Sequence, residues 1–144
     1  MDAYFDSAII VKLYVREATS PDAIRLVGAY AAPYWLTQWQ ALEVKNAIRV
    51  KAFRKEISAA EMNQSIAAFE QDIAAGRWQR PVYAAAAVEQ KADELSTSYS
   101  AVLGCRTLDI IHVAAAVVIG VKELVTFDGR QGAMARKAGL TVKP

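Results

Sequence analysis

The chain has 144 residues, of which 54% are hydrophobic, and its 17 basic and 15 acidic residues leave a formal net charge of +2. This length and composition predict a single domain over residues 1–144 with enough apolar material for one core. The charge is too small to indicate a nucleic-acid partner, so any such partner must be argued from a local site. One cysteine and one histidine exclude an intramolecular disulfide and the usual Cys/His zinc sites.

The first residues and the longest apolar stretch both argue against a membrane location. Residues 1–6 contain two acids and no basic residue, which is unlike a secretory signal. The stretch 110–121 contains His112 and Gly120 and is shorter than the roughly 20 residues that a membrane-spanning helix needs. We therefore expect a cytoplasmic protein that does not associate with a membrane.

Hydrophobic periodicity and cap residues predict strands and helices that alternate along the first half of the chain. Residues 3–5 are expected to form a short strand, after which Asp6 and Ser7 start a helix that reaches Tyr14. The elements expected next are helix 21–28, strand 33–37, helix 39–53 with Leu42, Ala47 and Ile48 available for its buried face, and helix 58–76 with a capping box from Ser58 to Glu61.

The second half of the chain continues the alternation and ends on two strands that flank a helix. The elements expected there are strand 80–83, helix 84–99, loop 100–106, helix 108–119 capped by Thr107, strand 123–126, helix 131–138 and strand 140–142. No hairpin signal separates consecutive strands. The pattern therefore predicts an α/β fold with an open, mostly parallel central sheet flanked by helices on both faces.

Four acidic residues lie where such a fold would gather them. Asp6 follows the first strand and Asp128 lies two residues beyond Thr126, so both would project from the carboxyl edge of the sheet. Asp109 lies in the first turn of its predicted helix, and Glu43 lies inside the third predicted helix. Clustered carboxylates repel one another unless hard cations occupy the cluster, and oxygen ligands select magnesium or manganese over zinc.

Each acid also has an ordinary structural explanation. Asp6 and Asp109 are suited to cap helices or to complement helix dipoles, and taken singly this use is the more common one. Glu43 fits the surface of its helix, and Asp128 begins a common Asp-Gly turn dipeptide. Taken singly, none of the four is specific for metal binding.

The remaining polar and aromatic candidates are expected to have structural roles. His112, three residues after Asp109, would either hydrogen-bond inside the core or help to shape the pocket, and the core role is the more common one. Cys105 is expected to be inert because no base accompanies it. Substrate phosphates could be met by Lys12, Arg106 and Arg130, and bases could stack on Trp35, Trp39 and Trp78. Lysine and arginine are more often ordinary surface residues, however, and tryptophan residues at such positions are more often part of the core.

The acids stand within motifs that resemble those of PIN-domain ribonucleases, in particular toxins of the VapC type. The opening FDSAIIVKLYVRE at 5–17 looks like the first strand and helix of these toxins. Their second, third and fourth acidic motifs are similar to LEVKNA at 42–47, LDIIHVA at 108–114 and LVTFD at 124–128. The motifs come in the family's order, and the tail AGLTV at 138–142 also fits.

This resemblance implies a PIN-like fold, a pocket for magnesium (Mg2+) or manganese (Mn2+), and endonucleolytic cleavage of RNA. The catalytic residues, which would hold the metal directly or through water, would be Asp6, Glu43, Asp109 and Asp128. Ser7 and Thr126 would support the pocket by hydrogen bonding. The resemblance also implies the toxin of a type II toxin–antitoxin pair, a cognate antitoxin protein and a homodimer. Residues 129–131 depart from some relatives because they contain no further acid.

The alternative is a non-catalytic PIN-like module that binds a protein or RNA. Retention of all four acids argues against it, because an abandoned site has no reason to keep a costly charge cluster. Two other acidic magnesium sites are excluded by the residues after the first strand. A phosphoacceptor receiver domain needs adjacent acids there, and a haloacid dehalogenase phosphatase needs two aspartates spaced by one residue, whereas the chain has Asp6, Ser7 and Ala8.

Overall fold

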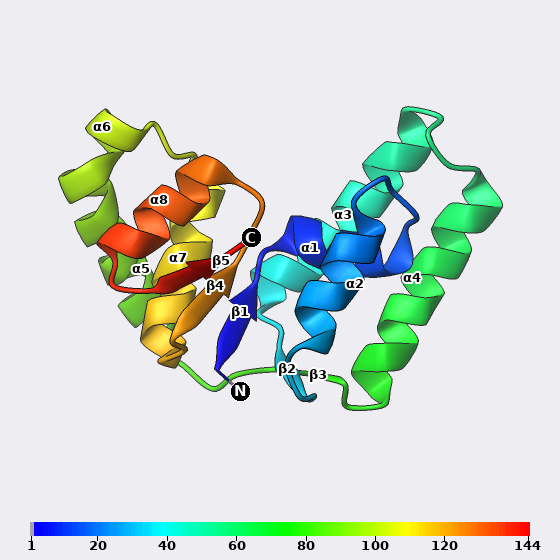
Figure 1. The fold of residues 1–144 in the computed structure, drawn as a ribbon, viewed down its shortest axis with the longest axis horizontal. Coiled ribbons are helices and arrows are strands. Elements are labelled where there is room, and N and C mark those ends of the chain that lie inside the picture. Colours follow the sequence, from blue (N-terminus) through cyan, green and yellow to red (C-terminus); the bar gives the residue numbers. More distant parts are fainter. Residues whose placement is uncertain (1) are drawn as a thin grey trace. The chain divides into compact units, whose positions relative to one another are not determined.

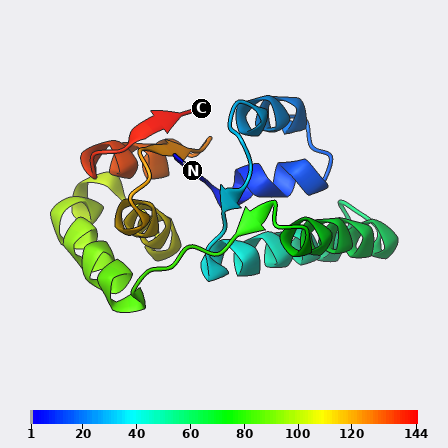
Figure 2. The same cartoon turned by 90° about the horizontal axis from the view of Figure 1, so that it is seen from below.

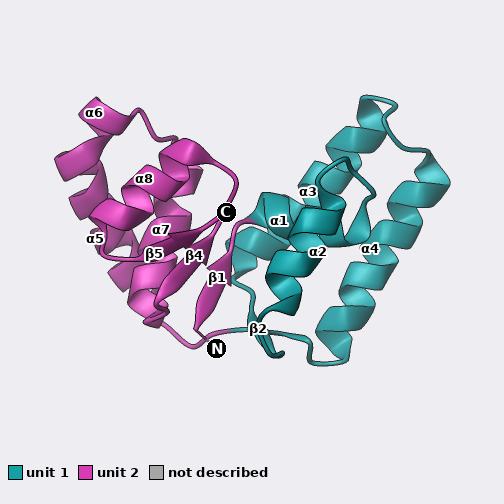
Figure 3. Cartoon of the chain, viewed as in Figure 1, with its two compact units in different colours: residues 1, 7–80 teal, residues 2–6, 81–144 magenta. Residues whose placement is uncertain are grey.

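The computed structural model describes residues 2–144 and divides them into two compact units (Figures 1 and 3). Unit 1 consists of residues Ser7–Arg80, and unit 2 combines Asp2–Asp6 with Pro81–Pro144. Unit 1 contains α1 (Ser7–Tyr14), α2 (Ser20–Gly28), β2 (Tyr34–Trp35), α3 (Gln38–Phe53), α4 (Ala59–Ala74) and β3 (Trp78–Gln79). Unit 2 contains β1 (Ala3–Phe5), α5 (Ala85–Leu95), the π-helical turn η1 (Ser96–Ser100), α6 (Ala101–Leu103), α7 (Thr107–Ile119), β4 (Glu123–Val125), α8 (Gly129–Lys137) and β5 (Thr141–Lys143). That residues 1–144 form one domain stays a prediction.

A three-stranded parallel sheet in the order β1-β4-β5 organises unit 2 (Figure 1). Phe5 is aligned with Val125, which in turn is aligned with Lys143. The side chains of Phe5 and Val125 are fully buried, as expected for parallel strands covered by other elements. Because β1 and β4 are parallel and in this register, the residues that follow them emerge side by side at the carboxyl edge of the sheet.

Two helices of unit 2 position the residues at this edge. The apolar helix α7 buries residues 113–116 and packs against α5 (Figure 2). Helix α8 crosses from β4 to β5, and it contains Gly132, where an added Cβ would lie 3.3 Å from Cγ1 of Val142. The absence of a side chain at Gly132 therefore lets the first turn of α8 approach β5 closely.

His112 is buried in unit 2, where its Nδ1 and the hydroxyl of Tyr4 are hydrogen-bonded at 2.8 Å. Their rings are also in contact, with centroids 5.9 Å apart. The bond joins β1 to α7, which are 108 positions apart in sequence. The prediction that His112 is a hydrogen-bonded core residue is confirmed.

Unit 1 is built on capped helices and a two-stranded parallel sheet of β2 and β3. A capping box between Thr37 and Gln40 begins α3, and the predicted box between Ser58 and Glu61 begins α4. The buried indole of Trp78 donates to the Tyr14 hydroxyl at 2.7 Å. That hydroxyl donates to Asp72, and burial, then this bond, raises the pKa of Tyr14 well above its ordinary range.

The prediction of parallel strands alternating with helices is confirmed, but residues 2–144 place the strands in two sheets rather than one. The predicted strand 80–83 is wrong, because β3 lies earlier in the chain. The amide of Tyr34 donates to the carbonyl of Arg77, and the amide of Leu36 donates to the carbonyl of Gln79. These bonds set the pairing before residue 80. Helices on both faces of a central sheet stay a prediction.

Three smaller predictions are also corrected. The predicted loop 100–106 is helical over Ala101–Leu103, and the turn ends at Gly104, whose φ of 64° suits a residue without Cβ. Thr107 does not cap α7, because Arg106 has the extended backbone of the cap position and Thr107 is already helical. Leu42 is 66% exposed, because the buried face of α3 runs through Ala41 and Val44 instead.

The structure also bears on a membrane association. Within residues 2–144, no helix combines the length and the apolar character that crossing a bilayer requires.

We predict that Tyr4→Phe lowers the free energy of unfolding by about 1 to 3 kcal/mol, because it leaves a buried ring nitrogen of His112 without this partner. Chemical denaturation would measure the change. Tyr99→Phe, at a half-buried tyrosine of η1, is the control for loss of a phenol hydroxyl. Equal losses in the two variants would contradict the structural role of the buried bond.

Candidate functional site

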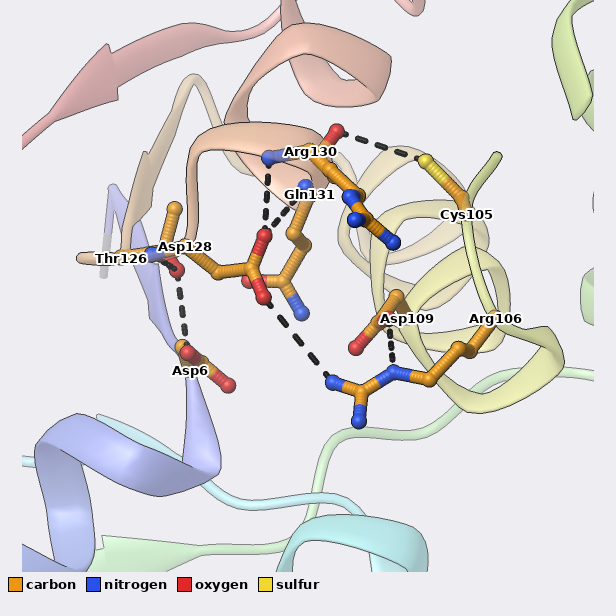
Figure 4. A network of polar contacts seen from close by, with 8 residues as sticks. All are labelled: Asp6, Cys105, Arg106, Asp109, Thr126, Asp128, Arg130 and Gln131. Carbon is orange, nitrogen blue, oxygen red and sulfur yellow. Dashed lines mark hydrogen bonds and ion pairs between the residues drawn. The ribbon is translucent and has the colours of Figure 1, made fainter. Parts of the chain in front are cut away.

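Asp6 lies at the carboxyl edge of the unit 2 sheet, directly after β1. Its amide donates to the carbonyl of Val125 at 2.9 Å, which continues the pairing with β4 by one residue. The residue is 8% exposed, and its Oδ2 accepts a hydrogen bond from the hydroxyl of Thr126 at 2.9 Å (Figure 4). The carboxylate of Asp6 is therefore fixed against the end of β4.

Thr126 connects two of the aspartates through one hydroxyl group. Its Oγ1 donates to Asp6 and accepts from the backbone amide of Asp128 at 3.0 Å (Figure 4). Thr126 itself is buried, and its amide donates to the carbonyl of Lys143 at the end of β5. The position of the hydroxyl is thus set by the sheet, and it holds both acids at the same edge.

Asp128 is the N-cap of α8. Its Oδ1 accepts hydrogen bonds from the amides of Arg130 at 2.8 Å and Gln131 at 3.0 Å. These two amides would otherwise lack an intrahelical partner. The turn predicted at Asp128 is therefore only part of the role of this residue. One of its carboxylate oxygens caps α8, and the other faces Arg106.

Asp109 enters the same network through Arg106 (Figure 4). The guanidinium Nε of Arg106 donates to Oδ2 of Asp109 at 3.0 Å, and Nη2 lies 3.9 Å from Oδ2 of Asp128. The Arg106 side chain is 76% exposed, whereas that of Asp109 is 14% exposed. The solvent-accessible guanidinium group of Arg106 therefore bridges the carboxylates of Asp109 and Asp128 and compensates part of their mutual repulsion.

The same residues line a hollow of about 520 Å³ in unit 2, formed by Arg106, Asp109, Asp128, Gly129 and Arg130. The pKa of the neighbouring Cys105 thiol is raised by burial and then by the negative charges of Asp109 and Asp128. Its thiol donates weakly to the carbonyl of Arg130 (Figure 4). Burial and these charges therefore favour the thiol of Cys105 over its thiolate, and that Cys105 is inert stays a prediction.

Gln131 contributes a further side-chain oxygen to the turn that Asp128 caps. The residue is 1% exposed, and within residues 2–144 its Oε1 has no hydrogen-bond partner. The side-chain oxygens of this network therefore belong to carboxylates, a hydroxyl group and an amide. This donor set fits a hard cation such as Mg2+ or Mn2+ and does not suit zinc.

The structure separates the predicted site residues between the two units. Asp6, Asp109, Thr126 and Asp128 form one connected polar network in unit 2, whereas Glu43 is half-buried on α3 of unit 1. Ser7 begins α1, is buried, and has an Oγ without a hydrogen-bond partner in residues 2–144. The convergence of Glu43 and Ser7 on the aspartates stays a prediction.

The aspartates as they stand do not form a coordination sphere. Within the described residues 2–144, no group of three or more His, Cys, Asp or Glu side chains is arranged to hold a metal ion. A guanidinium lies between Asp109 and Asp128, and a capping bond engages one oxygen of Asp128. Metal binding at this edge would therefore require the Arg106 side chain to move.

Two members of the network were not singled out by sequence as partners of the acids. Arg106 stands three positions before Asp109, and this spacing is a signal for an ion pair on one helix face. Gln131 carries no comparable signal, since a glutamine in the first turn of a helix is ordinarily exposed.

Unit 1 contains a larger hollow of about 650 Å³, lined by residues of α1, α2 and the segment between them. Its acid, Glu17, is paired with both Lys12 and Lys51, and despite burial these bonds lower the pKa of Glu17. The charge of Glu17 is thus compensated within the unit, and Asp6, Asp109 and Asp128 are not among the lining residues of this hollow. The carboxyl edge of unit 2 is therefore the better candidate.

Comparison with family models finds no match for this chain, and comparison with curated proteins finds none of significant similarity.

We predict that Asp128→Ala lowers the metal-free unfolding free energy by about 0.5 to 2 kcal/mol, because two amides of α8 lose their acceptor. Asp128→Asn is the matched control, since asparagine keeps the capping oxygen and removes only the charge. Urea denaturation in the presence of a chelator would compare them. A loss as large in the asparagine variant as in the alanine variant would contradict the capping role.

Proposed function

We propose that the chain is a PIN-like endoribonuclease that depends on Mg2+ or Mn2+, with Asp6, Glu43, Asp109 and Asp128 as the ligands of the metal. The observation that carries the proposal is that three aspartates from three distant segments join one polar network at the carboxyl edge of a parallel sheet. Ligands of open α/β sheets bind at this edge. The order and content of the acidic motifs support the family.

Residues of unit 2 would hold the metal ligands and contact the substrate. Thr126 holds the carboxylate of Asp6, and the first turn of α8 holds that of Asp128, so both are oriented before a ligand arrives. When bound, a divalent cation supplies a water activated as a nucleophile and neutralises charge on the departing oxygen. Arg106 and Arg130 line the hollow, where their charges can contact the phosphates on either side of the scissile bond. No catalytic histidine is needed, which agrees with the structural role of His112.

The resemblance also supports the biological setting of the proposal. In that setting the protein is the cytoplasmic toxin of a type II toxin–antitoxin pair, acts as a homodimer, and is held inactive by a cognate antitoxin protein. Its substrate is RNA. Ser7 and Thr126 support the pocket by hydrogen bonding.

We predict that Asp6→Asn and Asp109→Asn each abolish Mn2+-dependent cleavage of RNA while leaving the metal-free fold intact, because each removes a carboxylate ligand and reduces repulsion. Digestion of total RNA with mapped cut ends, run with Mn2+ and with chelator, would measure cleavage. Asp93→Asn, at an exposed aspartate of α5, is the control and should cleave as the wild type does. Cleavage that persists in both site variants, or that persists with chelator, would contradict the proposal.

We predict that Arg106→Gln tightens Mn2+ binding by about two- to fivefold, because the cation no longer has to displace an ion pair of the strength typical for exposed side chains. Isothermal titration of the purified protein with MnCl2 would measure the dissociation constant. Arg130→Gln removes the same charge from the same hollow without breaking the ion pair, and is the matched control. An equal gain in both variants would show a general charge effect rather than displacement of Arg106.

A further inference from the structure

The side chain of Gln131 is in an unfavourable environment unless something binds it. Its Oε1 is buried without a hydrogen-bond partner in residues 2–144. An amide oxygen that leaves water and gains no partner destabilises the folded state. A buried oxygen of this kind therefore calls for a ligand, an ordered water or an ion.

The backbone of Gln131 is fixed by the site itself. Its amide donates to Oδ1 of Asp128 at 3.0 Å, so its Cα is held within the cap of α8. Gly132, the next residue, brings this turn close to β5. In Figure 4 the side chain of Gln131 extends from the first turn of α8, the turn that Asp128 caps. The side chain of Gln131 therefore starts from the same turn as the capping bonds of Asp128.

The charge of the site favours a neutral ligand at this position. Asp6, Asp109 and Asp128 are three carboxylates for a cation of charge +2, and a further acid would add repulsion at a buried position. A glutamine amide offers a hard oxygen of the kind that Mg2+ and Mn2+ accept, and it brings no charge. Burial without a partner and a place in the turn that Asp128 caps are together what an amide ligand requires.

We infer that Oε1 of Gln131 is an additional ligand of the divalent cation, directly or through one water, at the edge formed by Asp6, Asp109 and Asp128. The inference rests on the proposed metal site. It assigns to the first turn of α8 two donors with different chemistry, the charged carboxylate of the cap and the neutral amide three residues later.

The test compares metal affinity with metal-free stability in variants of the full chain. Gln131→Leu and Gln131→Met remove the oxygen at similar side-chain size, whereas Gln131→Glu keeps an oxygen and adds charge. Gln71→Leu, at an exposed glutamine of α4, is the control for the chemical change. Titration calorimetry with MnCl2 gives the affinity, and urea denaturation with chelator gives the stability.

A ligand role predicts opposite effects in the two measurements. Gln131→Leu and Gln131→Met should weaken Mn2+ binding by about tenfold or more. In chelator their stability should equal or exceed that of the wild type, because an unpaired buried oxygen is removed. Gln131→Glu should bind Mn2+ at least as tightly as the wild type and be less stable in chelator, because a buried charge is added. Gln71→Leu should match the wild type in affinity.

Three results would overturn the inference. Unchanged Mn2+ affinity in both Gln131→Leu and Gln131→Met would show that the amide does not contribute to binding, and the proposed metal site would still stand. Loss of metal-free stability in both variants without loss of affinity would show a structural role instead. Failure of the wild type to bind Mn2+ at millimolar concentration would remove the metal site and the inference together.

Discussion

The parallel pairing of β1 with β4 is the constraint on which the candidate site depends. It joins the beginning of the chain to residues about 120 positions later and aligns Phe5 with Val125, so Asp6 and Thr126 emerge together. The hydroxyl of Thr126 then sets the distance between Asp6 and the start of α8. A slip of one residue in this register would turn Asp6 to the other face of the sheet and separate the acids.

Charge compensation within the protein reduces the repulsion among the acids at this edge. The negative charge of Asp128 is shared with two backbone amides at the positive end of α8, and Asp109 is paired with Arg106. These contacts are of unequal strength. The capping bonds are part of the helix, whereas Arg106 is an exposed side chain whose ion pair contributes little to the free energy of unfolding. A cation would therefore displace the arginine and leave the cap in place.

Sequence reasoning found the parts of the site that follow from local chemistry. Asp6 after a strand, Asp109 in a first turn and Asp128 before a helix are positions that periodicity and cap residues identify, and the structure joins the three in one network. Features set by tertiary pairing were missed. Strand β3 begins at Trp78 because the amides of Tyr34 and Leu36 bond to carbonyls that precede residue 80. Leu42 lies on the exposed side of α3 because Ala41 and Val44 form its buried face. Whether Oε1 of Gln131 has a hydrogen-bond partner depends on the packing around this one side chain, which no spacing rule describes.

The claim that Asp6, Asp109 and Asp128 form a metal site is tested most directly by a crystal structure of the protein grown with Mn2+, using the anomalous scattering of the metal. The account predicts an anomalous peak at the carboxyl edge of β1 and β4, bound by these carboxylates directly or through water, with the Arg106 side chain turned away from Asp109. A structure with Mn2+ bound elsewhere, or with the ion pair of Arg106 intact and no peak at this edge, would contradict it.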